Sequence, residues 1–185
     1  MIEFKKYVDG MLCIATPIYK GLYDDKIFKM CFNEQSWFDA ELRNINLLSS
    51  KYYAPNILNI DSSNKEITLD WKDACNLNHA FHKANNIPND WLEQVKSIIS
   101  DLEKSKVYKL NLYPHTFYVV NDKIHLMDLH ACVLHNDTIL EQDISSVIND
   151  RQRFKFVNGI LDIQHTYNYT IKNNVGNWPE EFLNA

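Results

Sequence analysis

The order of the predicted secondary-structure elements is the feature that most constrains the fold of this chain. Strand-like segments crowd residues 1–72 around one amphipathic helix, whereas helix-like segments dominate residues 73–185. Segregated strands and helices are typical of α+β proteins and argue against a doubly wound parallel sheet. A chain of 185 residues can form one domain, or two small parts that share an interface. We therefore predict an α+β fold in which a sheet-rich part meets a mainly helical part near residues 70–76.

Hydrophobic periodicity and turn residues locate the segments of the first part. The stretch 33–50 has apolar residues at helical spacing and predicts a helix. Before it, residues 11–19 and 26–32 are rich in β-branched and aromatic residues and predict strands, with "KGLYDD" as turn material between them. After it, residues 51–71 predict a hairpin that turns at "SSN".

The second part is predicted to contain three helices and a short hairpin. Residues 90–105 form a strongly amphipathic stretch that follows a capping aspartate. The segments "TFYVV" and "KIHLMDL" predict a hairpin across "ND", and residues from about 137 to 178 predict two helices separated near Gly159. The tail carries Trp178 and Phe182 one helical turn apart. We expect it to dock on the helical part, with an apolar patch for a partner as the alternative.

Composition excludes several classes of function. The net charge of −5 and the pI near 5.8 do not fit a nucleic-acid-binding protein, which needs a basic face. No segment approaches the roughly 18 apolar residues of a membrane span, and the N-terminal "MIEFKKYVDG" lacks the apolar run of a signal peptide. The four cysteines form no CxxC pair and are expected to be small core residues. We therefore predict a cytoplasmic protein with no nucleic-acid or membrane partner.

The balance of basic and amide residues suggests a source. Lysine and asparagine are abundant, whereas arginine occurs only at Arg43, Arg151 and Arg153. AAA and AAT codons would give this bias, so an AT-rich genome, such as a viral one, is the expected origin. A virus-encoded protein of this kind would act in the host cytoplasm.

The most informative single residue is Asp128, an acid inside the apolar segment "KIHLMDLH". Its neighbours are Leu126, Met127 and Leu129. A carboxylate in apolar surroundings is costly unless it is paired or binds a ligand. We therefore predict that Asp128 lines a functional or vestigial site, with a carboxylate that caps a turn as the alternative.

Together with the element order, four landmarks resemble the protein-kinase-like fold in a compact form, like that of small bacterial and phage proteins of the lipopolysaccharide and aminoglycoside kinase type. In "KIFKMCF", Lys29 resembles the strand lysine that holds the α- and β-phosphates, and Glu41 resembles the helix glutamate that pairs with it. The hairpin "APNILNIDSSNKEITLDW" resembles the one that leads to the adenine-binding hinge, here residues 70–73, which include Asp70 and Trp71. "NDKIHLMDLH" resembles the metal-binding hairpin, with Asp128 as a magnesium ligand. The resemblance covers nearly the whole chain and implies ATP and Mg²⁺ as cofactors.

Three other landmarks depart from that family. The segment "YKLNLYPHT" matches the catalytic loop through its leucine and proline, which puts Asn111 in the place of the catalytic aspartate and Thr116 in the place of the second metal-binding asparagine. An amide cannot accept the substrate's proton, and loss of a positioned base typically costs about 10²–10⁴-fold in rate. "CIATPIYKG" lacks the glycines that let a backbone approach phosphates, and His130 replaces the last glycine of D-F-G.

These departures leave three hypotheses open. The favoured one is a degenerate kinase-like protein, with an N-lobe over residues 1–72 and a C-lobe over residues 73–185, that binds nucleotide weakly and acts through an unknown protein partner or small molecule. The second is an active, atypical phosphotransferase that uses ATP and Mg²⁺, with His115 or Asp143 as the base. The third is an interaction module that has kept only the fold.

A transition-metal hydrolase is a further alternative. His125, Asp128, His130 and His135 lie within eleven residues of one another. On a strand, Asp128 and His130 share a face and His125 points the other way. Only two ligands therefore converge without a distant helper such as His115, whereas a zinc site needs three or four. We therefore expect ordinary buried or surface histidines rather than a metal centre.

Overall fold

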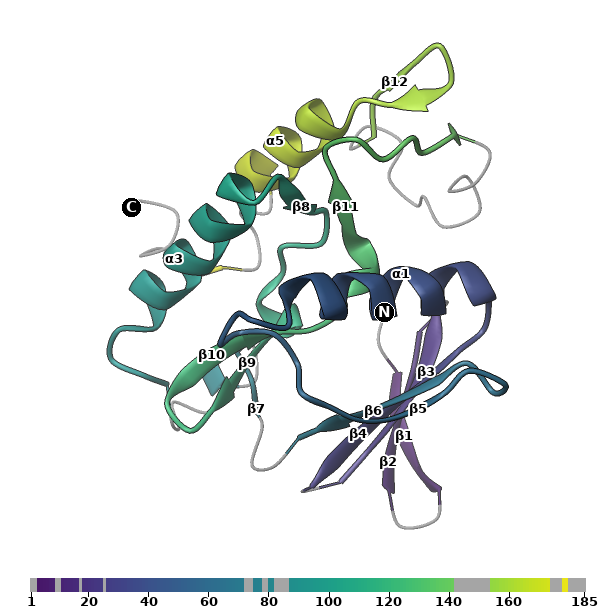
Figure 1. Cartoon of the computed structure of the whole chain (residues 1–185). Helices are drawn as coiled ribbons and strands as arrows, with labels where there is room; N and C mark the ends of the chain where they lie inside the picture. The colour runs from purple at the N-terminus through teal and green to yellow at the C-terminus, as the bar shows by residue number, and fades with distance from the viewer. Residues whose placement is uncertain are drawn as a thin grey trace.

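The computed structural model describes residues 3–8, 11–16, 18–24, 26–71, 75–77, 80–81, 87–141, 154–173 and 178–179. The first part of the chain forms a six-stranded antiparallel sheet in the spatial order β1-β2-β3-β4-β6-β5 (Figure 1). Its strands are β1 (Glu3–Val8), β2 (Met11–Ala15), β3 (Tyr19–Tyr23), β4 (Ile27–Phe32), β5 (Ile57–Asp61) and β6 (Glu66–Asp70). Helix α1 (Gln35–Leu48) lies across this sheet, between it and the second part of the chain.

The second part combines helices with small antiparallel sheets. Strands β7, β9 and β10 form one three-stranded sheet, and the pairs β8–β11 and β12–β13 form two more. The elements of this part are β7 (Cys75–Asn76), α3 (Trp91–Lys104), β8 (Val107–Lys109), β9 (Phe117–Val120), β10 (Lys123–Leu126), β11 (Cys132–Leu134), β12 (Phe156–Val157), β13 (Ile160–Leu161) and α5 (Ile163–Asn173). No helix in the described part of the chain is both long enough and apolar enough to cross a membrane.

Strand and helix periodicity explain which side chains face the interior. Along β4, Phe28, Met30 and Phe32 are buried, and the residues between them face the other side of the sheet. Along α1, the buried positions Phe38, Glu41, Asn44, Ile45 and Leu48 recur at helical spacing. Glu41 and Asn44 are therefore carried into the interior on the same helix face as the apolar residues.

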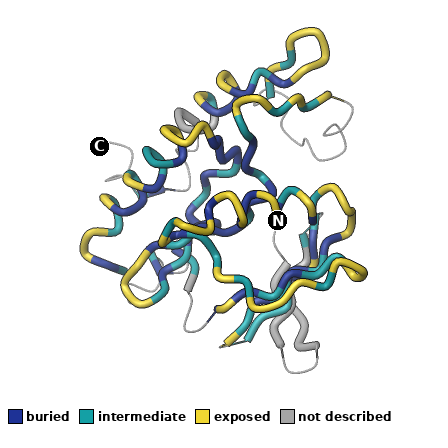
Figure 2. Tube along the Cα trace, in the orientation of Figure 1, coloured by how far each residue is buried: buried dark blue, intermediate teal, exposed yellow. Residues whose placement is uncertain are grey.

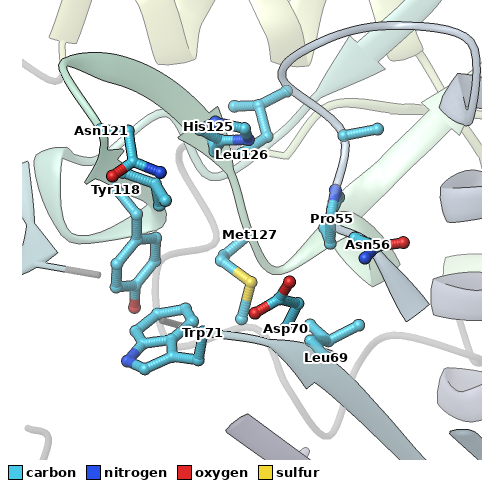
Figure 3. Close-up of a pocket in the computed structure, with 12 residues that line it drawn as sticks. Pro55, Asn56, Leu69, Asp70, Trp71, Tyr118, Asn121, His125, Leu126 and Met127 are labelled. Carbon is cyan, nitrogen blue, oxygen red and sulfur yellow. The ribbon is translucent and has the colours of Figure 1, made fainter. Parts of the chain in front are cut away.

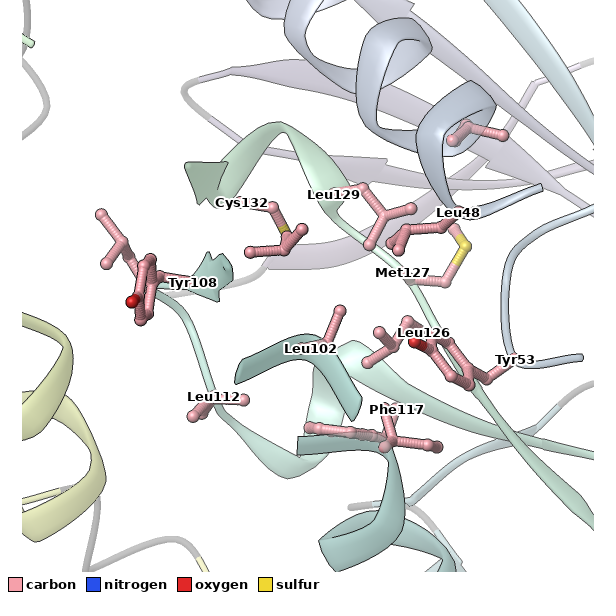
Figure 4. Close-up of a cluster of buried hydrophobic side chains, with 14 of the residues drawn as sticks. Leu48, Tyr53, Leu102, Tyr108, Leu112, Phe117, Leu126, Met127, Leu129 and Cys132 are labelled. Atoms are coloured by element: carbon pink, nitrogen blue, oxygen red, sulfur yellow. The ribbon is translucent and has the colours of Figure 1, made fainter. Parts of the chain in front are cut away.

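One apolar core connects the two parts of the chain. Leu48 at the end of α1 and Tyr53 after it belong to the same cluster as Leu102 of α3, Phe117 of β9 and Leu126 of β10 (Figure 4). Figure 2 shows the buried residues concentrated along α1 and along the strands and helices that face it. Continuous burial of this kind couples the positions of α1 and the β9–β10 hairpin.

The predicted hairpin near Asp128 is confirmed. Strands β9 and β10 pair in register, with Val120 opposite Lys123. Asn121 and Asp122 between them have φ values of 49° and 59°. Left-handed residues at both central positions are typical of the two-residue turns that match the twist of a hairpin, and asparagine and aspartate tolerate that conformation.

Two predicted boundaries are wrong. The segment expected to be a turn contains β3, where Gly21 serves packing: a Cβ there would lie 2.8 Å from the Phe28 ring. Gly159, expected to separate two helices, lies in the turn of the β12–β13 hairpin with a φ of +76°. The second of those helices is confirmed as α5. Most of the segment assigned to the first one lies outside the described residues.

Candidate functional site

Asp128 stands where β10 has ended and a short turn begins. Its backbone is left-handed, with φ 57° and ψ 50°, a conformation that aspartate tolerates better than most residues. Its Oδ1 accepts a hydrogen bond of 2.6 Å from the Tyr19 hydroxyl, which comes from the start of β3. Burial, reinforced by the charge of Asp128, raises the pKa of Tyr19 well above its usual value. The phenol therefore stays a donor, and the carboxylate is paired within the chain.

A buried lysine also binds the backbone of the same turn. Lys109, at the end of β8, is fully buried, and its Nζ donates to the carbonyl oxygens of Met127 at 2.6 Å and Asp128 at 3.1 Å. Burial lowers the pKa of Lys109. The sequence alone did not indicate a role for Lys109. Its only signal was a lysine between the apolar residues Tyr108 and Leu110.

Helix α1 supplies two more polar contacts to this turn. Glu41 is fully buried, and its Oε2 accepts from the backbone N–H of His130 at 2.5 Å and lies 3.0 Å from the Nδ1 of that ring. Asn44, one helical turn later, donates to the carbonyl oxygens of Leu129 at 2.7 Å and Cys132 at 2.8 Å. Among the described residues, Glu41 Oε1 has no hydrogen-bond partner. Glu41 therefore links α1 to the turn through hydrogen bonds with His130.

The predicted pair between Lys29 and Glu41 is wrong. The Nζ of Lys29 lies 2.7 Å from the Oε2 of Glu66 on the neighbouring strand β6. Strand alternation is the reason: Lys29 points to the side of β4 opposite the buried Met30. The hydrogen bond with Glu66 raises the pKa of Lys29. The structure thus brings Glu41 and Asp128 to one turn, but it does not bring Lys29 there.

Thr116 and Asn111 lie in the loop between β8 and β9. The Thr116 hydroxyl is fully buried and donates to the carbonyl oxygens of Asn111 at 3.0 Å and Tyr113 at 2.9 Å. This geometry does not fit the predicted role as a metal ligand, because the hydroxyl closes its own loop. The Oδ1 of Asn111 is buried and has no partner among the described residues. The loop therefore holds an amide in the predicted position of the base.

Aromatic rings fill the region predicted to bind adenine. The Trp71 indole stacks on Phe28, with ring centroids 5.0 Å apart and planes 30° apart. The indole also meets the Tyr118 ring edge-on, with ring centroids 4.4 Å apart, and Figure 3 shows Tyr118 pointing toward it. The Tyr23 ring lies 6.1 Å from Phe28 and 6.4 Å from Trp71. These four residues, the aromatic stack, join β3, β4, the end of β6 and β9.

The backbone N–H groups of Asp70 and Trp71 also form hydrogen bonds within the chain. The Trp71 N–H donates to the Lys26 carbonyl at 2.9 Å, and the Asp70 N–H donates to the Asn56 carbonyl at 2.9 Å. The Asp70 side chain is exposed at the end of β6. The next two residues of the predicted hinge, 72 and 73, lie outside the described residues.

The histidines proposed for a transition-metal site do not converge. The His130 ring binds Glu41, His125 lies beside Tyr52, and His135 lies beside Tyr108. In the described ranges, no three His, Cys, Asp or Glu side chains come together to hold a metal ion.

Of the two residues predicted as alternative bases, only His115 lies among the described residues. The His115 ring stacks on Tyr113 with ring centroids 5.3 Å apart, and burial lowers the pKa of His115. Asp143 lies outside the described residues.

In the tail, Trp178 docks as predicted, because its Nε1 donates to the Leu112 carbonyl at 2.9 Å. Phe182 lies beyond the described residues.

Comparisons with known proteins identify the fold. No protein-family model and no curated protein matches the chain. Among solved structures, monomeric WbdD matches with a TM-score of 0.53 and 11% identity, over 70% of this chain and 35% of WbdD. A second WbdD structure, described as a bifunctional kinase-methyltransferase, matches with a TM-score of 0.46 and 13% identity, over 70% of this chain and 33% of that one. The chain spans about a third of the length of WbdD. At this identity the likeness concerns the fold alone: this chain and part of WbdD have similar folds.

Proposed function

We propose that this chain is a degenerate kinase-like protein that works by binding a partner rather than by transferring phosphoryl groups. In this proposal the fold has two lobes, residues 1–72 and 73–185, and the chain's own side chains occupy the cleft between them. The free thiols of Cys31 and Cys132 fit a reducing, cytoplasmic location.

The observation that carries the proposal is the aromatic stack. The resemblance to kinases implies that adenine would dock at residues 70–73. The Trp71 indole of this segment is in contact with Phe28 of β4, at 5.0 Å between ring centroids, and with Tyr118 of β9, at 4.4 Å. Rings at these distances are in direct contact, so a purine cannot enter without displacing the indole. Trp71 is only 8% exposed, and displacement would forfeit its burial, worth roughly 2–3 kcal/mol.

The polar groups of the cleft support the same conclusion. Phosphoryl transfer depends on cations that hold the phosphates and on carboxylates that hold Mg²⁺. On the inner side of β4 the position next to Lys29 is the apolar Met30, and Lys29 itself pairs with Glu66 on the other side. The Asp128 carboxylate already accepts the Tyr19 hydroxyl at 2.6 Å. A bound ATP would therefore lack the lysine and would compete with a phenol for the aspartate.

Removal of the indole tests the proposal directly. In thermal-shift and calorimetric titrations, we expect neither adenosine nor ATP with Mg²⁺ to stabilise the wild-type protein. Trp71→Ala opens the space between Phe28 and Tyr118, and adenosine should then raise the melting temperature. Trp91→Ala is the matched control, because Trp91 lies on α3 against Phe81 and Trp178. Trp71→Leu replaces the alanine variant should that one fail to fold.

Other results would favour the competing functions. ATP turnover by the wild type that Asp128→Ala abolishes would establish an active phosphotransferase and overturn the proposal. Binding of ATP to the wild type without turnover would retain a degenerate kinase but refute the blocked cleft. A Trp71→Ala variant that folds and still binds no adenosine would favour a pure interaction module that has kept only the fold.

A further inference from the structure

A cavity of about 190 Å³ lies beside the aromatic stack, where the segment after α1, the end of β6 and the β9–β10 hairpin meet. Leu69, Leu126 and Met127 line it, and all three are buried, so the core fixes this part of the wall. Figure 3 shows Met127 between Trp71 on one side and Pro55 on the other, and both of these also line the cavity. The interior of the cavity is therefore mainly apolar.

The lining contains little that would favour a charged ligand. No lysine or arginine is among the described residues of the lining. His125 lines the cavity, and burial lowers its pKa, so its ring is neutral near pH 7. Asp70 lines it as well, but this residue has an interaction within the chain. Because burial of an unpaired charge is costly, a neutral occupant is the one that this cavity fits.

The volume limits the size of that occupant. A dry apolar cavity of about 150 Å³ holds a benzene molecule. A cavity of about 190 Å³ can therefore hold one six-membered aromatic ring, whereas a fused double ring needs more space. The thioether of Met127 favours such a ring further, because sulfur makes attractive contacts with aromatic groups.

Two amide side chains lie at the mouth of the cavity. Asn56, just before β5, and Asn121, in the β9–β10 turn, both line the cavity and are exposed. A primary amide both donates and accepts hydrogen bonds, so it can pair with the N–H and C=O groups of a peptide backbone. A ring that is attached to a peptide therefore matches both the apolar interior and the polar mouth.

We propose that this cavity, the Met127 cavity, receives the phenyl ring of a phenylalanine from a partner protein. The inference rests on the proposed partner-binding function and names the side chain by which the partner is held. The ring is complementary to the interior in charge and in size, and the amides of Asn56 and Asn121 receive the backbone beside it. Aromatic side chains buried in this way contribute much of the binding energy of protein interfaces.

Methionine methyl NMR gives a direct readout. The sequence contains four methionines: Met1, Met11, Met30 and Met127. Met127 lines the cavity, whereas Met30 is fully buried on the inner side of β4 and does not line it. With ¹³C-methyl-labelled protein, a ligand in the cavity should move the Met127 signal and leave Met30 unchanged. The probes are N-acetylphenylalanine N-methylamide, the corresponding alanine and tryptophan derivatives, and toluene, which carries the ring without a backbone.

We expect the blocked phenylalanine to move the Met127 signal with a dissociation constant on the order of 1 mM, as suits a single side chain. The blocked alanine lacks the ring and should bind at least about tenfold more weakly. The blocked tryptophan overfills the cavity, and toluene makes no contact with the amides at the mouth, so both should bind more weakly than the blocked phenylalanine.

Substitutions that fill the cavity give a second test. Val120 of β9 lines it and is only partly buried, so Val120→Phe adds bulk to the lining without removing a core side chain. This variant should lose the response of Met127 to the blocked phenylalanine. Val157→Phe is the matched control, because Val157 is 52% exposed on β12 and does not line the cavity. Ala54→Leu fills the cavity from another part of its wall should Val120→Phe fail to fold.

Several results would overturn the assignment. A Met127 signal that the blocked phenylalanine does not move would leave the cavity without this ligand. Equal binding of the blocked alanine would remove the ring, and equal binding of the blocked tryptophan would remove the match in size. A response that persists in the filled variants would place the ring elsewhere.

Binding of toluene without binding of the blocked phenylalanine would point to a free aromatic molecule instead of a partner's side chain, and would also overturn the assignment. None of these results bears on the adenosine titrations with Trp71→Ala. The blocked cleft and the Met127 cavity therefore fail independently.

Discussion

Two regions of the molecule, the polar half around the Asp128 turn and the aromatic half around Trp71, differ in the kind of contact that fills them. In the polar half, Oε2 of Glu41 accepts from the His130 N–H and Oδ1 of Asp128 accepts from the Tyr19 hydroxyl. In the aromatic half, Phe28, Trp71 and Tyr118 fill the space with rings in contact. Buried carboxylates in one region therefore serve contacts within the chain, whereas aromatic packing fills the other. Substitutions in each half test whether these contacts have the roles assigned to them.

Glu41→Ala should have the largest effect, because it removes the carboxylate that links α1 to the turn at His130. The substitution leaves the buried N–H of His130 without an acceptor and opens a cavity behind α1. We expect a loss of about 3 kcal/mol in the free energy of unfolding, measured by urea denaturation. Glu41→Gln keeps a carbonyl acceptor and should lose less than half as much. Equal losses below about 1 kcal/mol for both variants would mean that the link between Glu41 and His130 does not stabilise the fold.

Lys109→Met should come next, at about 2 kcal/mol. The variant keeps the length of the side chain but removes the ammonium donor from both carbonyls, and the Asp128 carbonyl keeps the Ala131 N–H at 3.3 Å. Lys104→Met, at the end of α3, is the matched control and should stay within about 0.5 kcal/mol. A Lys109→Met variant that is as stable as the wild type would show that the turn does not need the ammonium.

The same lysine predicts a dependence on pH. Burial lowers the pKa of Lys109 in the folded state, so between that value and the ordinary lysine pKa the unfolded chain binds more protons. Stability contributed by this group therefore rises with pH in that window. The gap in unfolding free energy between the wild type and Lys109→Met should widen as the pH is raised from 7 toward about 10. A gap that narrows would contradict a desolvated ammonium.

Tyr19→Phe should cost about 1.5 kcal/mol and should test the contact that links the two halves. It removes the hydroxyl that donates to Asp128 while keeping the ring contacts with Phe28, Phe32 and His130. The freed carboxylate should gain affinity for Mg²⁺ or Mn²⁺, which manganese-induced NMR line broadening near residue 128 would detect. Equal broadening in the wild type would mean that the phenol does not block the carboxylate.

Local patterns predicted much of this fold, and long-range contacts account for the rest. The helix at 90–105 and the Asp128 hairpin follow from periodicity and turn chemistry, which act within a few residues. The apolar alternation of Phe28, Met30 and Phe32 already indicated that Lys29 faces away from the interior, and the kinase resemblance outweighed that signal.

The aromatic stack and Lys109 could not be predicted in this way. The position of Trp71 depends on rings from β4 and β9, which are distant in the sequence. The burial of Lys109 depends on the path of the turn at 127–128, whose carbonyls it binds. No spacing rule connects such pairs before the chain has folded.

Lys29→Met should have the smallest effect. It tests whether Lys29 acts only on the outer side of the sheet or also affects the region around Trp71. Lys29 pairs with Glu66 at 2.7 Å, and its side chain is 34% exposed, so the pair contributes below about 1 kcal/mol. Because Glu66 raises the pKa of Lys29, that small contribution is complete at pH 7 and is lost only as the pH rises through the folded-state value. Urea denaturation of Lys29→Met and Glu66→Gln should give matching small losses, and neither variant should change the adenosine response of Trp71→Ala. A Lys29 variant that abolished that response would return the lysine to the cleft and would reverse the distinction between the inner and outer sides of β4.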